Sequence, residues 1–273
     1  MSAPIGTIVV KLGGRAMATE GALAALAVEL RARAGTVVLV HGGGPEVSAW
    51  SERLGLVPRF HGGRRVTDEA TLEVATAVLA GLANKRLVAA LAAHGVDAVG
   101  LAALDGGLVR AVAHPDSAEL GAVGAIAGVD PALVETLLAS GRTPVIASIG
   151  AHHGLLLNLN ADDVAAALAV GLGARALVLL SDAPGVVLDG RVVARLDPDR
   201  ADAARAHADV KDGMGPKLEA AACAVRGGVG RAVIAAWNGP GTLAALLDGR
   251  ADAGPAGTHV LSVLLPEEAE HGR

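Results

Sequence analysis

Amide and carboxylate side chains alternate in a short segment near the middle of the chain. It follows the apolar run of residues 155–157 and precedes an apolar helical pattern. Its polar members are Asn158, Asn160, Asp162 and Asp163. This order predicts that a strand ends, polar groups project, and a helix begins. A helix N-terminus has free N–H groups and partial positive charge, so the segment predicts part of a site for a phosphate-bearing ligand.

Two glycine-rich turns in the first half could bind the same kind of ligand. Lys11 stands before Gly13 and Gly14 at the end of the first apolar run, and residues 41–44 read His-Gly-Gly-Gly at the end of the second. Glycines let main-chain N–H groups approach an anion closely. Each turn alone also fits an ordinary strand end. The His-Gly-Gly-Gly string occurs in some esterases, but the chain has no Gly-x-Ser-x-Gly elbow, and it has neither a Walker pattern nor the full dinucleotide fingerprint.

Three further loops precede or follow predicted elements. Arg64 and Arg65 precede a helix opened by Asp68; an Arg there suits bidentate capture of a carboxylate, although a solvated pair also fits. We interpret Thr67 as the N-cap of that helix. The loop 181–186 follows the strongest predicted strand, and the loop 211–217 opens a helix. Lys217 near that helix start opposes the helix dipole at a cost of roughly 0.3–1 kcal/mol, which a ligand anion would offset.

Composition narrows the class of protein. The chain has 273 residues, of which 52% are hydrophobic, and a formal net charge of −5. A disordered chain would not carry so much apolar surface, and a nucleic-acid binder would show a basic patch, so we expect no nucleic-acid partner. The longest apolar run, 164–180, is short for a membrane span and contains Arg175, so we expect no membrane association and a cytoplasmic location. We expect Cys223 to be a small core residue and His152–His153 to be an exposed loop, with no protein metal site.

Apolar runs alternate with helical patterns along the chain. Predicted strands are 7–12, 36–40, 96–101, 143–149, 176–180, 231–236 and 259–265. Predicted helices are 22–34, 46–54, 68–93, 131–140, 163–172, 216–226 and 242–247. Strands without polar alternation fit a parallel sheet buried on both faces, and residues 108–129 predict a hairpin over the sheet. Ligands of such sheets lie at the carboxyl ends of the strands, where the motifs fall.

Taken in order, these motifs resemble the amino acid kinase family, in particular its acetylglutamate branch. The matching strings are Lys11-x-Gly13-Gly14, His41-Gly42-Gly43-Gly44, Gly63-x-Arg65-Val66-Thr67-Asp68, Asn84-Lys85, Asn158-x-Asn160-Ala161-Asp162, Ser181-Asp182-x-x-Gly185-Val186 and Gly213-Met214-x-x-Lys217. They cover nearly the whole chain. Gly215 and the segment 237–240 depart from the family pattern on the nucleotide side.

The resemblance implies a three-layer αβα sandwich with a central, mainly parallel sheet. It implies one domain with a substrate-side lobe of about residues 1–173 and an ATP-side lobe of about 174–273. By motif matching, the catalytic residues are Lys11, Lys217 and Asp162, with Asp162 orienting the two lysines. The substrate-binding residues are Gly43, Gly44, Arg65, Asn158 and Asn160. The nucleotide-binding residues are Gly13, Gly14, Ser181, Asp182, Gly185, Val186, Lys211 and Met214.

The implied reaction transfers the γ-phosphoryl group of ATP to the side-chain carboxylate of N-acetyl-L-glutamate. A carboxylate with a reference pKa of about 4.3 is already ionised, so no general base is needed. The requirement is to neutralise charge between two anions, and Mg²⁺ arrives on ATP. Because the first predicted strand starts near residue 1, we expect a homodimer without arginine feedback. Alternative readings are a kinase for a carrier-linked aminoadipate or glutamate, and a non-catalytic ligand sensor on the same fold.

Overall fold

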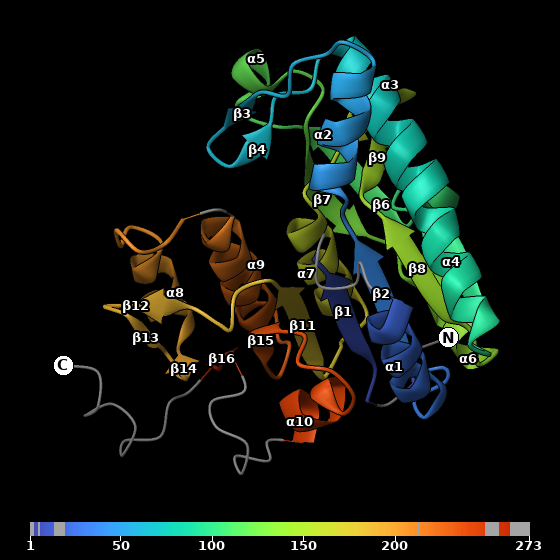
Figure 1. The fold of residues 1–273 in the computed structure, drawn as a ribbon, viewed down its shortest axis with the longest axis vertical. Coiled ribbons are helices and arrows are strands. Elements are labelled where there is room, and N and C mark those ends of the chain that lie inside the picture. Colours follow the sequence, from blue (N-terminus) through green and yellow to red (C-terminus); the bar gives the residue numbers. More distant parts are fainter. Residues whose placement is uncertain (1–2, 5, 14–19, 212, 249–256, 263–273) are drawn as a thin grey trace.

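A single eight-stranded sheet forms the centre of the molecule (Figure 1). The computed structural model describes residues 3–4, 6–13, 20–211, 213–248 and 257–262. The strand order is β14-β16-β15-β11-β1-β2-β8-β5. Their bounds are β1 (Ile8–Leu12), β2 (Val37–His41), β5 (Ala98–Ala102), β8 (Thr143–Ala147), β11 (Ala176–Ser181), β14 (Arg195–Leu196), β15 (Ala232–Ala236) and β16 (Thr258–Val260). Neighbours run parallel except β15 and β16, which confirms the predicted, mainly parallel sheet.

The central strands are buried on both faces, as their unbroken apolar sequences predict. In β1, Val9 packs into one core and Val10 into the other, because successive side chains of a strand point to opposite faces. The first core contains residues of α6 (Ala132–Ala139), α7 (Ala161–Gly171) and α9 (Met214–Arg226). The second contains residues of α1 (Glu20–Arg31), α4 (Asn84–Ala93) and α10 (Thr242–Asp248). Helices therefore cover both faces of the sheet, which confirms the three-layer sandwich.

The predicted helix 68–93 consists of three consecutive segments. They are α3 (Glu69–Thr76), the π-helical segment η1 (Ala77–Ala83) and α4. Asp68 caps α3 because its Oδ1 accepts a hydrogen bond from Thr71 N at 2.9 Å. The prediction of Thr67 as the N-cap is wrong: Thr67 is buried, and its hydroxyl donates to the Arg65 carbonyl at 2.9 Å.

Several small elements extend beyond the sheet. The predicted hairpin over residues 108–129 is confirmed as β6 (Val109–Ala113) and β7 (Gly124–Val129), which pair antiparallel. Three more antiparallel pairs were not predicted: β3 (Phe60–His61) with β4 (Arg64–Arg65), β9 (Ile149–His152) with β10 (Leu155–Asn158), and β12 (Val187–Leu188) with β13 (Arg191–Val192). The remaining helices are α2 (Gly44–Arg53), the 3₁₀ turn η2 (Asp105–Gly107), α5 (Ser117–Leu120) and α8 (Pro198–Ala204).

Two expectations about single features are corrected or limited by the structure. Cys223 is exposed on α9, so its prediction as a core residue is wrong. Residues 263–265 of the last predicted strand lie outside the described residues.

The combined helix Glu69–Ala93 is long and apolar enough to cross a membrane by length and composition alone, and 33% of its apolar window is buried. The boundary between the two lobes stays a prediction.

Candidate functional site

Two lysines from opposite halves of the chain meet at one carboxylate. Lys11 lies near the end of β1, Asp162 lies in the first turn of α7, and Lys217 lies in the first turn of α9. Lys11 Nζ is 2.9 Å from Asp162 Oδ1, and Lys217 Nζ is 3.3 Å from Oδ2. The second contact is also a hydrogen bond, and the first is an ion pair at a shorter distance. The strand end and the two helix starts thus place two cations side by side.

The charges of this cluster support one another. Burial alone would raise the pKa of Asp162, but the Lys11 and Lys217 ammonium groups together lower it below its ordinary value. Burial lowers the pKa of Lys217, and Asp162 opposes that change. The side chains of all three residues are largely buried. Asp162 is therefore an ionised carboxylate that holds two ammonium groups together.

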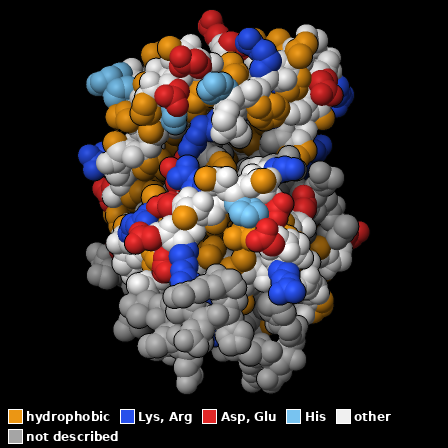
Figure 2. Space-filling view, turned by 90° about the vertical axis from the view of Figure 1, so that its left-hand side faces the viewer, with side chains coloured by type: hydrophobic (Ala, Val, Ile, Leu, Met, Phe, Trp, Pro, Cys, Tyr) orange, Lys and Arg blue, Asp and Glu red, His pale blue; other side chains and the backbone are white. Residues whose placement is uncertain are grey.

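Two cavities meet at these lysines. The first, of about 300 Å³, lies toward α2 and the β3–β4 hairpin, and the second, of about 540 Å³, lies toward β11 and α9. Both are lined by Lys11 and Lys217. On the face seen in Figure 2, basic side chains lie around a hollow between the part with β3 and β4 and the part with α8 and β12. The arrangement can hold two ligands whose reacting ends share the two cations.

All five predicted substrate-side residues line the first cavity: Gly43, Gly44, Arg65, Asn158 and Asn160. Gly43 caps α2 and Gly44 is its first residue. An added Cβ at Gly43 would lie 2.8 Å from a Leu79 methyl group, whereas Cβ at Gly44 would meet nothing within 4 Å. An alanine at position 43 would therefore press on the Leu79 side chain, whereas the space beside Gly44 is open for a ligand.

Arg65 is buried against three different groups at the edge of this cavity. Its Nη2 donates to the Gly44 carbonyl at 2.8 Å and to Ser48 Oγ at 2.7 Å. The Phe60 ring lies 4.8 Å from the guanidinium carbon. Among the described residues, Nη1 has no hydrogen-bond partner, although it is buried. An unpaired buried donor is costly, and a bound carboxylate is a group that would satisfy it.

The amide side chains are partly used by the protein itself. Asn158 Nδ2 donates to Thr67 Oγ1 at 3.1 Å. Asn160 caps α7: its Oδ1 accepts from the N–H groups of Asp162 at 2.8 Å and Asp163 at 3.2 Å. Those two N–H groups are therefore not free for an anion, contrary to the expectation for this helix start. The N-terminus of α2 has no side-chain cap and lines the first cavity.

Most of the predicted nucleotide-side residues line the second cavity. They are Gly13, Ser181, Asp182, Gly185, Lys211 and Met214. Val186 is fully buried beside the cavity, and its N–H donates to Thr258 Oγ1 at 2.8 Å. Gly14 lies outside the described residues. An added Cβ at Gly13 would lie 2.5 Å from the Leu180 carbonyl oxygen, so only glycine lets β1 and β11 end this close together.

Several residues near the site were given no role by the sequence analysis. Phe60 and Ser48 contact Arg65, but an aromatic in a two-residue strand and a serine inside a helix carry no local signal. Asn84, from the matched Asn-Lys string, donates to His41 Nε2 at 3.0 Å and to the Val145 carbonyl at 2.9 Å. Burial lowers the pKa of His41, which fits a neutral ring that supports the end of β2.

Among the described residues, one group of three could offer metal ligands. Asp189, His207 and Asp209 have ligand atoms within 4.8 Å of one another, and Asp209 also lines the second cavity. The Asp189 N–H already donates to Asp209 Oδ2 at 2.8 Å. The group is open to solvent on the Asp189 and Asp209 side. These contacts join the β12–β13 turn to the segment before α9.

An α/β sandwich with two cavities that share two lysines fits an enzyme that transfers a group between two bound anions. The chain belongs to the amino acid kinase family, whose family model matches residues 6–236. It is 46% identical over 223 residues to an acetylglutamate kinase of Methanopyrus kandleri, covering 78% of this chain and 88% of that protein. It is 41% identical over 240 residues to an acetylglutamate kinase of Symbiobacterium thermophilum, covering 82% of each. The solved structure of smu.665 from Streptococcus mutans UA159 is similar with a TM-score of 0.81 and 28% identity, covering 94% of this chain and 99% of that one.

Proposed function

We propose that this chain is an acetylglutamate kinase of arginine biosynthesis, which phosphorylates the side-chain carboxylate of N-acetyl-L-glutamate with ATP. The observation that carries the proposal is the pair of lysines on Asp162 at the junction of the two cavities. The names of the curated relatives support the substrate, and the family supports the use of ATP. The product is an acyl phosphate, and the second product is ADP.

The substrate would occupy the cavity beside α2. Arg65 would bind its free α-carboxylate through the unpaired Nη1, and Asn158 and Asn160 would border the acetyl-amide end. The side-chain carboxylate would then point toward Lys11 and Lys217. Glycine at position 44 leaves the room that this substrate needs.

The main role of the site in the proposed reaction is to neutralise negative charge. An ionised carboxylate attacks a polyanionic phosphate, so the barrier is largely electrostatic and no proton must be removed. Lys11 and Lys217 would lie on the transferring phosphoryl group, at the boundary of both cavities. Such preorganised donors act most strongly in a site that excludes water. Asp162 would hold the two ammonium groups together before the phosphate arrives.

The nucleotide would occupy the second cavity, with its phosphates toward the lysines. Mg²⁺ would enter on ATP, because both oxygens of Asp162 already face lysines and cannot complete a protein cage for the ion. Asp182 follows directly after β11 and lines this cavity. Its carboxylate would contact the ion or the water ligands of the ion. Mg²⁺ would supply further positive charge at the phosphates.

The long helix Glu69–Ala93 would form the interface of the proposed homodimer. It is apolar, 33% of its apolar window is buried within the chain, and its exposed positions include small residues such as Ala77 and Ala89. A second copy packed against it would cover that surface, and the enzyme would work in the cytoplasm as a dimer, without membrane association. Light scattering during gel filtration would give twice the chain mass; a monomer at micromolar concentration would contradict this part of the proposal.

A coupled assay for ADP release tests the activity. N-Acetyl-L-glutamate should support turnover, and free glutamate, N-acetylaspartate and carrier-linked aminoadipate should support far less. Preference for a carrier-linked substrate would favour the alternative kinase. ADP release no faster than in the absence of any acceptor would favour a ligand sensor and contradict the proposal.

A further inference from the structure

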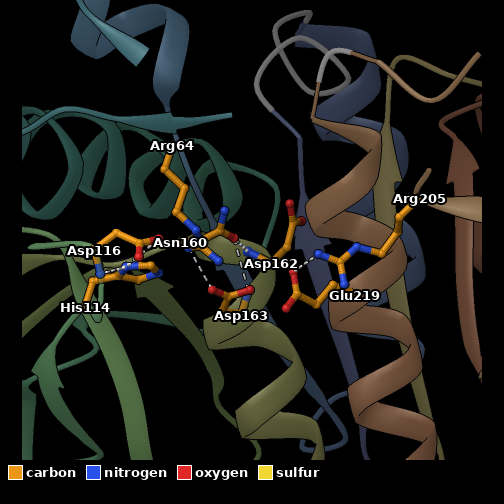
Figure 3. A network of polar contacts seen from close by, with 8 residues as sticks. All are labelled: Arg64, His114, Asp116, Asn160, Asp162, Asp163, Arg205 and Glu219. Atoms are coloured by element: carbon orange, nitrogen blue, oxygen red, sulfur yellow. Dashed lines mark hydrogen bonds and ion pairs between the residues drawn. The ribbon is translucent and has the colours of Figure 1, made fainter. Parts of the chain in front are cut away.

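An ion pair between Arg64 and Asp163 joins the substrate side of the site to the helix that carries Asp162. Arg64 Nη1 lies 2.9 Å from Asp163 Oδ2, and Figure 3 shows the Arg64 side chain reaching from its strand to the start of α7. We infer that this ion pair is a positioning contact that holds the β3–β4 hairpin, and with it Arg65, over the substrate cavity. The inference rests on the proposed function of Arg65 as the carboxylate anchor.

The hairpin has little structure of its own. Its two strands pair through two residues each, and they are joined by Gly62 and Gly63, both with positive φ. An isolated two-stranded hairpin is marginal in water, so contacts to the rest of the protein must fix its position. Phe60 and His61 on its outer strand are exposed, so this strand contributes little burial.

The position of the pair links two residues of the site directly. Arg64 precedes Arg65 on β4, and adjacent strand residues point to opposite faces, so Arg65 can face α2 while Arg64 faces α7. Asp163 follows Asp162, and both N–H groups are held by Asn160. The ion pair thus connects Arg64, which is next to the predicted substrate anchor Arg65, with Asp163, which is next to Asp162.

The Arg64–Asp163 ion pair is partly buried. The Arg64 and Asp163 side chains are 17% and 27% exposed. Arg64 lines the substrate cavity and also a separate cavity of about 590 Å³ among β7, α7 and α9, whose wall includes Asp163. Burial raises the pKa of the Asp163 carboxyl, and the Arg64 guanidinium opposes that rise. Arg64 therefore lines both cavities, and because its pair with Asp163 is partly buried, salt screens it less than a fully exposed pair.

A double-mutant cycle in the full-length enzyme tests the inference. Arg64→Ala and Asp163→Ala should each raise KM for N-acetyl-L-glutamate on the order of tenfold, because the hairpin is no longer fixed over the cavity. The double variant should show about the same rise as either single one, since the contact can be lost only once. KM for ATP should change by less than about twofold. Asp163→Asn, which keeps the side-chain size, should lie between wild type and Asp163→Ala.

Matched controls separate positioning from general stability. Asp202→Asn weakens a more exposed ion pair far from the substrate cavity, Arg226 with Asp202 at 2.7 Å between α8 and α9, and should leave both KM values unchanged. Lower melting temperatures with unchanged KM, or single effects that multiply in the double variant, would overturn the inference. Arg65→Lys measured in parallel tests the proposed function instead: if it leaves KM for the acyl amino acid unchanged, the anchor itself is wrong. If only Arg65→Lys raises that KM, the anchor stands and the positioning role of Arg64 is wrong.

Discussion

Lys11 and Lys217 contact different oxygens of the same buried carboxylate. Lys11 Nζ is 2.9 Å from Asp162 Oδ1, and Lys217 Nζ is 3.3 Å from Asp162 Oδ2. One lysine comes from the first strand of the sheet and the other from a late helix, so only the complete fold brings them together. Their separation is set by the protein before any phosphate binds. A site of this kind avoids reorganisation during the reaction, which is the main advantage of preorganised charges.

Removal of one of the two cations should mainly slow turnover. We expect Lys217→Ala to lower kcat on the order of 10²–10³-fold, as for loss of one preorganised donor to the transferring group. Steady-state ADP release at saturating substrates measures this. Arg226→Ala, an exposed cation at the other end of α9, is the matched control and should leave kcat unchanged. A kcat for Lys217→Ala close to that of the control would remove Lys217 from the catalytic residues.

Asp162 should make stability depend on pH in the acid range. Folding lowers its pKa below the ordinary 3.8, so its ionised form stabilises the native chain fully above that value, and the stabilisation is lost as pH falls through the lowered folded-state pKa. Asp162→Asn leaves two ammonium groups without their partner and should cost on the order of 3–5 kcal/mol at neutral pH. Urea unfolding of both proteins should give a difference that shrinks as pH drops below 3.8. A difference independent of pH would show that the lost charge is not its cause.

The order of motifs was enough to predict that the candidate site residues gather at one edge of the sheet. In a parallel sheet the carboxyl ends of the strands share one edge, so Lys11 near the end of β1, Gly43 after β2 and Ser181 at the end of β11 must lie near one another. The contacts that hold the site could not be predicted in this way. Arg64 and Asp163 are 99 positions apart, and strands of two residues have no periodicity to detect.

The wrong predictions for Thr67 and Cys223 each have a cause in the immediate surroundings of the residue. Thr67 and Asp68 are both good N-caps, and the choice of Asp68 depends on the burial of Thr67, whose backbone pairs with residues 120–122. Cys223 belongs to an Ala-rich helix whose weak amphipathic pattern does not show which face is buried. The turn at Asn160 was placed correctly, but its side chain serves the helix itself, which only coordinates could show.

Substitution of the predicted substrate anchor should affect one substrate more than the other. Arg65→Ala should raise KM for N-acetyl-L-glutamate by 10-fold or more, about 1.4 kcal/mol per factor of ten, with a smaller effect on KM for ATP. Arg65→Lys should restore little, because an ammonium cannot form the planar two-point contact. Initial rates with each substrate varied at saturation of the other measure both constants. Arg59→Ala, at an exposed position just before the hairpin, is the control; an effect of Arg65→Ala confined to ATP would reverse the assignment of the two cavities.

Gly44 offers a test of ligand contact that is separate from protein packing. An added methyl group there meets no protein atom within 4 Å, whereas at Gly43 it would press on Leu79. We therefore expect Gly44→Ala to leave the melting temperature within about 1 °C of wild type, since surface changes stay within about 0.5 kcal/mol, but to raise KM for N-acetyl-L-glutamate. Gly43→Ala should lower the melting temperature as well, because the methyl group and the Leu79 side chain compete for the same space. Thermal unfolding and initial rates on both variants separate the two outcomes. If Gly44→Ala bound substrate as well as wild type does, the acyl amino acid would not lie against the start of α2, and the wall formed by Arg65 and Asn158 would have to hold it alone.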